Sequence, residues 1–338
     1  MLALTDAAPF IAAQELGLFA RRHLHVELHR EIGWATIRDK IIYGELDAAH
    51  APAPMLWSIQ LGLGCPPCPV LTALVTSVNG NALTLSRALW DAGVRDGATL
   101  HAHARQHRAR QPLTFGVVFP FSSHHLLLRD WLQAAGFEPE RDVRIVVVPP
   151  AQMFRNLNAG TLDGFCAGEP WNSVAVREGA GWCPTWSAIW RPGHVEKILL
   201  VTTQFAESRP AEHAALVRAL SEAAAWCDDQ SNRPRLVAML ADARYLNLPA
   251  AVIAPTLQGQ FDCGHGRIEP APDFHVFHRD GATVPALAKA QALQAALTSA
   301  GLLPGGVDPI LQLPRRLFRE DLHREILQPH HLPHEIAS

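Results

Sequence analysis

The strongest constraint on the fold is a phrase that occurs twice in the sequence. Residues 44–54, GELDAAHAPAP, match residues 160–170, GTLDGFCAGEP, at a constant offset. Four of the identical positions pair Gly44 with Gly160, Leu46 with Leu162, Asp47 with Asp163 and Pro54 with Pro170. In each copy a helical pattern ends at the glycine and a short apolar run follows. The repeat therefore predicts two similar α/β units in one chain.

Around each copy, helical patterns alternate with strand patterns. The first unit predicts helices over 9–19 and 34–44 and strands over 24–29 and 47–51. The second unit predicts helices over 124–137 and 151–160 and strands over 143–149 and 162–168. Such alternation indicates parallel sheets covered by helices on both faces, with ligands bound beyond the carboxyl ends of the strands.

Two units with two crossings between them indicate a hinged, cleft-forming binding protein, so we expect a two-lobed α/β fold. Lobe 1 is expected to combine residues 1–86 with 198–260, and lobe 2 to span 87–197. Residues 261–338 turn Pro-rich and then helical. We expect them to form a C-terminal extension packed on lobe 1.

Composition narrows the possible functions. The chain has 338 residues, of which 48% are hydrophobic, and a formal net charge of -3. This balance allows a sizeable core and argues against direct nucleic-acid binding, which needs a basic face. No apolar run reaches 18 residues, so no membrane span is expected. The start, MLALTDAAPF, has neither the basic region of an export signal nor a lipobox, which favours a cytoplasmic location.

Catalytic and metal signatures are scarce. The sequence has no Walker A loop, no nucleophile elbow and no zinc-protease motif, and we expect no cofactor. The pair Cys65 and Cys68 lacks a second CxxC, and the histidines of residues 101–110 alternate with Arg as on a solvated face. No metal site is therefore expected. An enzyme with Cys65, Cys68 or Cys166 as nucleophile is a minor alternative.

A small set of hydrogen-bond donors is expected at the ends of the predicted elements. Its members are Trp34 and His124 near helix starts, Asn81 in NGNALTLS, the backbone amide of Gly168, and Lys197 at a crossing between the lobes. Helix N-termini favour anions, and a set made only of donors suits nitrate or nitrite. Bicarbonate has an O–H group that requires an acceptor, so it fits such a set less well.

Seven stretches, in order from residue 4 to about residue 285, resemble the nitrate-binding proteins among the nitrate/sulfonate/bicarbonate receptors of ABC importers. They also resemble the cytoplasmic relatives of these receptors that sense nitrate and nitrite. The stretches are LTDAAP, GWATIRDKIIYGELDAAHAPAPM, NGNALTLS, SSHHLLLRDWL, AGTLDGFCAGEPWN, GHVEKILLVT and FHRDGATVP. The resemblance implies a periplasmic-binding-protein-like fold of type II that holds its anion between the lobes.

The resemblance also implies which residues bind the ligand. It assigns this role to Trp34, Asn81, His124, Gly168 and Lys197, and the lysine favours nitrate or nitrite over bicarbonate. The position of Asn81 is often a glutamine in nitrate receptors. Family members also begin with a complete strand before LTDAAP, of which this sequence has only residues 1–4.

Two functions are compatible with these expectations. The first is a cytoplasmic, non-enzymatic sensor of nitrate and nitrite, whose partner in this family is an RNA-binding antiterminator. The alternative is the substrate-binding component of a nitrate ABC transporter, with the membrane subunits as partners and a periplasmic location. A signal or lipobox upstream of residue 1 would favour the transporter component.

Overall fold

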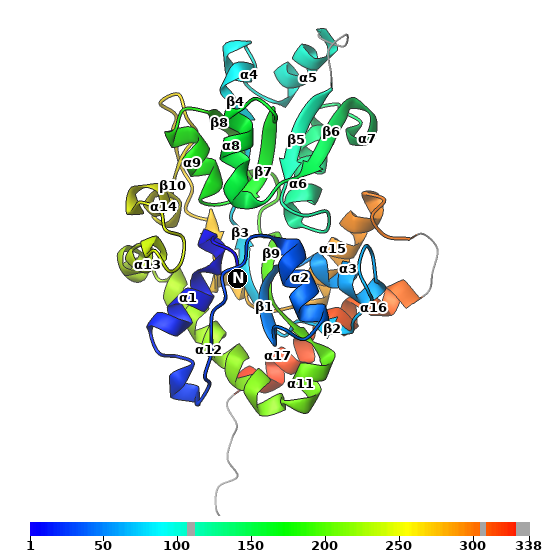
Figure 1. Ribbon diagram of the computed structural model, residues 1–338, viewed down its shortest axis with the longest axis vertical. Helices are drawn as coiled ribbons and strands as arrows, with labels where there is room; N and C mark the ends of the chain where they lie inside the picture. Colours follow the sequence, from blue (N-terminus) through cyan, green and yellow to red (C-terminus); the bar gives the residue numbers. More distant parts are fainter. Residues whose placement is uncertain (107–111, 305–308, 329–338) are drawn as a thin grey trace, which may run out of the picture.

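The computed structural model describes residues 1–106, 112–304 and 309–328. Two α/β lobes lie one above the other in Figure 1, and strands β3 (Val75–Asn79) and β9 (Val195–Thr202) lie where they meet. The chain leaves the lower lobe after β3 and returns to it with β9. The predicted two-lobed α/β architecture is therefore confirmed.

Lobe 1, the lower lobe of Figure 1, is built from both ends of the chain. Its sheet has the order β1-β9-β3-β12, with β2 paired to β9. Its first part comprises η1 (Thr5–Ala7), α1 (Ala8–Glu15), η2 (Ala20–Arg22), α2 (Trp34–Ile42), β1 (Ala48–Pro52), α3 (Met55–Leu61) and β2 (Val70–Leu71) before β3. After β9 follow α11 (Thr203–Ser208), α12 (Pro210–Asp228), η4 (Gln230–Asn232), α13 (Arg233–Ala241) and α14 (Ala250–Leu257).

Lobe 2, the upper lobe, has a sheet with the order β6-β5-β7-β4-β8. Its strands are β4 (Asn81–Ser86), β5 (Leu113–Val117), β6 (Val143–Val147), β7 (Gly164–Gly168) and β8 (Gly181–Trp186). Its helices are α4 (Arg87–Asp91), α5 (Gly97–Gln106), α6 (Ser123–Ala134), α7 (Pro139–Asp142), η3 (Pro150–Gln152), α8 (Met153–Asn158), α9 (Trp171–Arg177) and α10 (Ser187–Trp190). The described part of the predicted 101–110 segment belongs to α5, and residues 107–110 lie outside the described residues.

The repeated phrase has the same structure in both lobes. Gly44 follows α2 with φ +73°, and Gly160 follows α8 with φ +71°. Only glycine adopts this left-handed conformation without strain, so it ends each helix cleanly. A buried strand follows in each lobe, β1 or β7, and then a short helix, α3 or α9. The predicted succession of helix, glycine and strand is confirmed.

Two predictions about the sheets are wrong. Residues 24–29 form no strand, although Leu24, Val26 and Leu28 are half-buried and alternate with exposed neighbours. Every pairing between the named strands of lobe 1 is antiparallel in the described residues, and only β5 with β6 and β7 pairs in parallel. The reason is that β9 enters lobe 1 from lobe 2 and therefore runs opposite to β1 and β3.

The strand pairing also differs from the expected lobe boundaries. β4 pairs with β7 and β8, so residues 81–86 belong to the lobe 2 sheet, whereas Val195–Lys197 pair within lobe 1. The crossings thus lie near Gly80 and His194. The backbone changes direction at the first crossing through positive φ angles at Asn79 and Gly80.

The expected C-terminal extension contacts both lobes. It contains β10 (Gln260–Asp262), β11 (Ile268–Pro270), β12 (His275–Val276), η5 (Arg279–Gly281), α15 (Leu287–Ser299), α16 (Pro309–Leu317) and α17 (Glu320–Leu327). β12 pairs with β3 in lobe 1, while the Cys263 carbonyl accepts a hydrogen bond from the Cys183 amide of lobe 2 at 2.9 Å. Across the ranges that the structure describes, no helix combines the length and apolar character that crossing a membrane requires.

Candidate anion-binding site

The five predicted ligand residues come from five different elements around the junction of the lobes. Trp34 begins α2, Asn81 begins β4, His124 lies in the first turn of α6, Gly168 ends β7 and Lys197 lies in β9. The side chains of Trp34, Asn81, His124 and Lys197 are at most 1% exposed. Four polar side chains are thus buried where the two sheets approach each other, which requires partners for them.

The structure brings these five residues together. The Lys197 ammonium lies 5.3 Å from the centre of the Trp34 ring. A Cβ atom at position 168 would lie 3.5 Å from Asn81 Oδ1 and 3.6 Å from His124 Nε2. The glycine therefore leaves space in front of both side chains. We call the group of Trp34, Asn81, His124, Gly168 and Lys197 the cage.

Two carboxylates that the sequence analysis missed, Asp6 and Glu196, contact the cage. Asp6 Oδ2 lies 2.7 Å from Lys197 Nζ, and Lys197 also pairs with Glu196 Oε1. The opposite oxygen of Asp6 lies 3.0 Å from Nε2 of His50. Both acids stand in quoted stretches, LTDAAP and GHVEKILLVT. The position of Glu196 directly before Lys197 could have indicated a carboxylate in the site, but an acceptor is not expected among the ligands of an anion.

The ionisation of the cage follows from this pairing. Burial alone would lower the pKa of Lys197, but Asp6 and Glu196 outweigh burial and raise it. Burial opposes ionisation of Asp6, yet Lys197 and His50 lower its pKa to about 2. Lys197 and His124 likewise hold the pKa of Glu196 well below its ordinary value against the effect of burial. Lys197 is therefore charged, and so are both acids.

His124 is neutral in this structure. Burial lowers the pKa of its imidazole to about 4, although Glu196 opposes the shift. Its Nε2 lies 3.4 Å from Glu196 Oε1, and neither ring nitrogen makes a well-oriented hydrogen bond. The Trp34 Nε1–H group is also buried without a partner. These buried and unpaired groups are free to contact a ligand.

Asn81 differs from its predicted role as a donor. Its Nδ2 donates to Glu196 Oε2 at 2.6 Å and lies 3.2 Å from Nε2 of His194. Both amide hydrogens are thus directed to protein acceptors, and Oδ1 is left buried without a partner. The unpaired atom of Asn81 in this structure is therefore an acceptor, whereas the sequence predicted a donor at this position.

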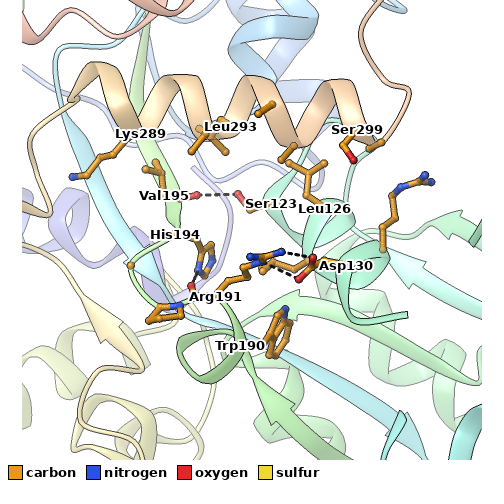
Figure 2. Close-up of a pocket in the computed structure, with 18 of the residues that line it drawn as sticks. Ser123, Leu126, Asp130, Trp190, Arg191, His194, Val195, Lys289, Leu293 and Ser299 are labelled. Atoms are coloured by element: carbon orange, nitrogen blue, oxygen red, sulfur yellow. Dashed lines mark hydrogen bonds and ion pairs between the residues drawn. The ribbon is translucent and has the colours of Figure 1, made fainter. Parts of the chain in front are cut away.

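A cavity of about 800 Å³ lies next to the cage. Helices α6 and α15 and residues 190–195 line it, and the five cage residues do not. Figure 2 shows His194 at its wall, near the paired Arg191 and Asp130. The His194 ring thus lines the cavity and also contacts Asn81 of the cage.

No cysteine is set up as a nucleophile among the described residues. Cys166 is fully buried, and burial raises its pKa well above the ordinary value. Burial also raises the pKa values of Cys65 and Cys68. A nucleophilic cysteine needs the opposite shift, toward the thiolate.

The two lobes and the buried polar cage between them define a solute-binding protein of the periplasmic-binding-protein type. The family model described as the NMT1-like family matches residues 1–241. The chain belongs to this family, because the match covers well over half of it.

Curated relatives narrow the comparison. The nitrate import ATP-binding protein NrtC of Synechocystis sp. is 39% identical over 81% of this chain and 41% of its own length. The bicarbonate transport ATP-binding protein CmpC of Synechococcus elongatus is 41% identical over 74% of this chain and 38% of its own length. The nitrate/nitrite binding protein NrtA of Synechococcus elongatus is 33% identical over 96% of this chain and 75% of its own. The chain thus spans about two fifths of the ATP-binding relatives.

Among solved structures, the periplasmic nitrate-binding protein NrtA from Synechocystis PCC 6803 superposes with a TM-score of 0.92. It is 29% identical in sequence, and the alignment covers 98% of this chain and 88% of the NrtA chain. The expected resemblance to nitrate-binding receptors is confirmed at the level of fold and family.

Proposed function

We propose that this protein binds nitrate or nitrite in the cage and delivers it to the membrane subunits of an ABC importer. The observation that most supports the anion is that the Lys197 ammonium lies 5.3 Å from the centre of the Trp34 ring, whose Nε1–H group has no partner, with both side chains buried between the lobes. A buried cation with neighbouring free donors is the arrangement that a small oxyanion requires.

The comparisons favour the importer over the cytoplasmic sensor that the sequence analysis placed first. Named relatives are a nitrate/nitrite binding protein and ATP-binding proteins of nitrate and bicarbonate import. The similar solved structure is described as periplasmic. On these grounds we propose transporter subunits as the partners and the periplasm as the location.

The role is binding rather than catalysis. In support of this proposal, the described cysteines lack the pKa shift of a nucleophile, and NrtA of Synechococcus elongatus, which matches 96% of the chain, is named a nitrate/nitrite binding protein. Fold similarity alone would not decide the point, because a desulfurization enzyme shares the fold at a TM-score of 0.59 and 13% identity.

Titration calorimetry tests the proposed ligand. Nitrate, nitrite, bicarbonate and methanesulfonate are titrated into the purified full chain at one pH and one ionic strength. We expect binding of one nitrate or nitrite per chain, and weaker binding of methanesulfonate because its methyl group cannot use the donors of the cage. Absence of heat with both nitrogen oxyanions would contradict the proposed function.

A further inference from the structure

The charges of the cage do not balance. Its one ionised amine, Lys197, pairs with two ionised carboxylates, Asp6 and Glu196, and all three are at most 1% exposed. The nearest imidazole, that of His124, is neutral because burial lowers its pKa to about 4. The empty cage therefore has a charge of about -1 by this accounting, and a nitrate ion would add a second negative charge.

Other titratable groups surround His124. Glu196 and Lys197 face it from β9, Asp6 from η1, and His194 from the segment before β9, where its Nε2 lies 3.5 Å from Glu196 Oε2. Beyond Asp6 lies His50 of β1, whose pKa is lowered by burial. His275 of β12 is neutral as well, because burial lowers its pKa to about 3. In the described ranges, no group of three His, Cys, Asp or Glu side chains is arranged to hold a metal ion.

His124 is placed to take up the missing positive charge. Its Nε2 lies 3.4 Å from Glu196 Oε1, and both ring nitrogens lack a well-oriented hydrogen bond. A neutral imidazole has one donor and one acceptor, whereas an imidazolium has two donors. Protonation would therefore give His124 a charged contact with Glu196 and a second N–H group that can donate to the ligand.

We propose that the cage binds its anion together with one proton from solvent, that His124 holds this proton, and that Glu196 sets the one-to-one stoichiometry. The inference rests on the proposed function, because it requires an anion in the cage. It goes further, because it makes Glu196 a positioning residue that determines which charge state is bound. The only bond that forms is an N–H bond on the His124 imidazole, with the proton supplied by solvent as the anion enters.

The sign of the pH dependence follows by linkage. In the empty cage His124 titrates near pH 4, and a neighbouring anion raises this pKa because it stabilises the imidazolium. Between about pH 5 and the raised pKa, binding takes up one proton. The dissociation constant for nitrate should then increase about tenfold for each unit of pH in this window.

Calorimetry measures the proton directly. Nitrate is titrated into the wild-type chain at pH 6 in two buffers of different ionisation enthalpy, and the difference in heat gives the number of protons bound. We expect about one proton for the wild type. For Glu196→Gln we expect a value near zero, because the variant removes the excess negative charge but keeps the pair of Lys197 with Asp6.

A matched control distinguishes the two buried glutamates. Glu169 follows Gly168, is 1% exposed, and has a pKa raised to about 7 by burial, so it is the rival site for a proton. Proton uptake should persist in Glu169→Gln. Uptake that is lost in Glu169→Gln and kept in Glu196→Gln would overturn the assignment to His124 and Glu196.

The calorimetric result distinguishes failure of the proposed function from failure of the proton uptake proposed here. No heat with wild type in either buffer would contradict the proposed function itself. Heat with a proton number near zero would leave the function standing and overturn this inference. The wild-type proton number decides whether a proton enters with the anion even if Glu196→Gln does not fold.

Discussion

At the scale of single residues, Lys197 combines two tasks. It is the only cation in contact with Asp6 and Glu196 within the described cage, and it lies over the Trp34 ring. Removal of one partner from a buried ion pair leaves uncompensated charge, which is more costly than the pair is favourable. The residue proposed to attract the ligand therefore also stabilises the empty protein.

Lys197→Met should lower the free energy of unfolding by about 3 to 5 kcal/mol, because two buried carboxylates lose their cation. Urea unfolding at pH 7 measures this change. Lys40→Met is the control, since Lys40 makes one ion pair with Glu31 at the partly exposed end of α2 and should change stability little. Equal losses in both variants would contradict the charge network described here.

Glu169 gives a prediction about pH. Burial raises its pKa to about 7 from an ordinary value of 4.5. Because the folded state favours protonated Glu169, this residue contributes its full stability below about pH 4.5, and the contribution is lost as the pH rises through 7. Glu169→Gln should abolish this loss, which amounts to about 3 kcal/mol between pH 4 and pH 8.

Urea unfolding at pH 5 and pH 8 checks this difference, with the exposed Glu178→Gln as control. The wild type and the control should lose stability over this range relative to Glu169→Gln. Parallel pH profiles for all three proteins would show that Glu169 titrates normally.

At the scale of elements, the crossing between β3 and β4 is held by specific contacts. Asn79 Nδ2 donates to the Asp273 carbonyl at 2.8 Å, and its Oδ1 accepts from the Gly193 amide at 2.8 Å. The next residue, Gly80, has φ +91°, and a Cβ there would lie 2.9 Å from Nδ1 of His275. This crossing is thus tied to the second crossing and to the C-terminal extension.

Gly80→Ala should be more destabilising than Gly179→Ala. Both glycines have positive φ, which costs alanine about 1 to 2 kcal/mol, but a Cβ on Gly179 would meet nothing within 4 Å. The contact with His275 should add about 1 kcal/mol or more at Gly80. Denaturant unfolding of the two variants measures the difference, and equal values would show that the hinge is not tightly packed.

The elements also show what the sequence could predict. The glycine-ended helices and the buried strands after them were predictable, because Gly44 and Gly160 follow periodic patterns and only glycine suits that conformation. The strand over 24–29 was predicted from alternation alone, and alternation says nothing about a hydrogen-bonding neighbour. Pairing directions depend on which lobe a strand enters from, which local pattern does not contain.

The cage was predictable in part for a similar reason. The five residues were found through the resemblance and through their places at the ends of elements. Asp6 was missed because its contact with Lys197 joins segments that are far apart in the chain. Glu196 directly precedes Lys197, but its contact with Asn81 is not visible in the sequence. The ligand role of the five residues stays a prediction until binding is measured.

At the scale of the whole molecule, the burial of the cage between the two lobes determines how an ion can enter. The cage side chains are at most 1% exposed, so an ion cannot enter unless the lobes separate. Nitrate binding should favour the closed form only through contacts that exist there. Small-angle X-ray scattering should show a smaller radius of gyration with saturating nitrate than with chloride at equal ionic strength. An unchanged radius would indicate that entry does not require lobe separation.

The most direct test of the central claim is the nitrate affinity of Trp34→Phe compared with that of Trp182→Phe. Both tryptophans are at most 2% exposed and both have an unpaired Nε1–H, but Trp182 belongs to the core of lobe 2. Trp34→Phe loses a hydrogen bond to the anion, so its nitrate affinity should fall by about 1.5 to 3 kcal/mol, or roughly 10- to 150-fold. Trp182→Phe should keep the wild-type affinity. Equal affinities in the two variants would contradict an anion site at the cage.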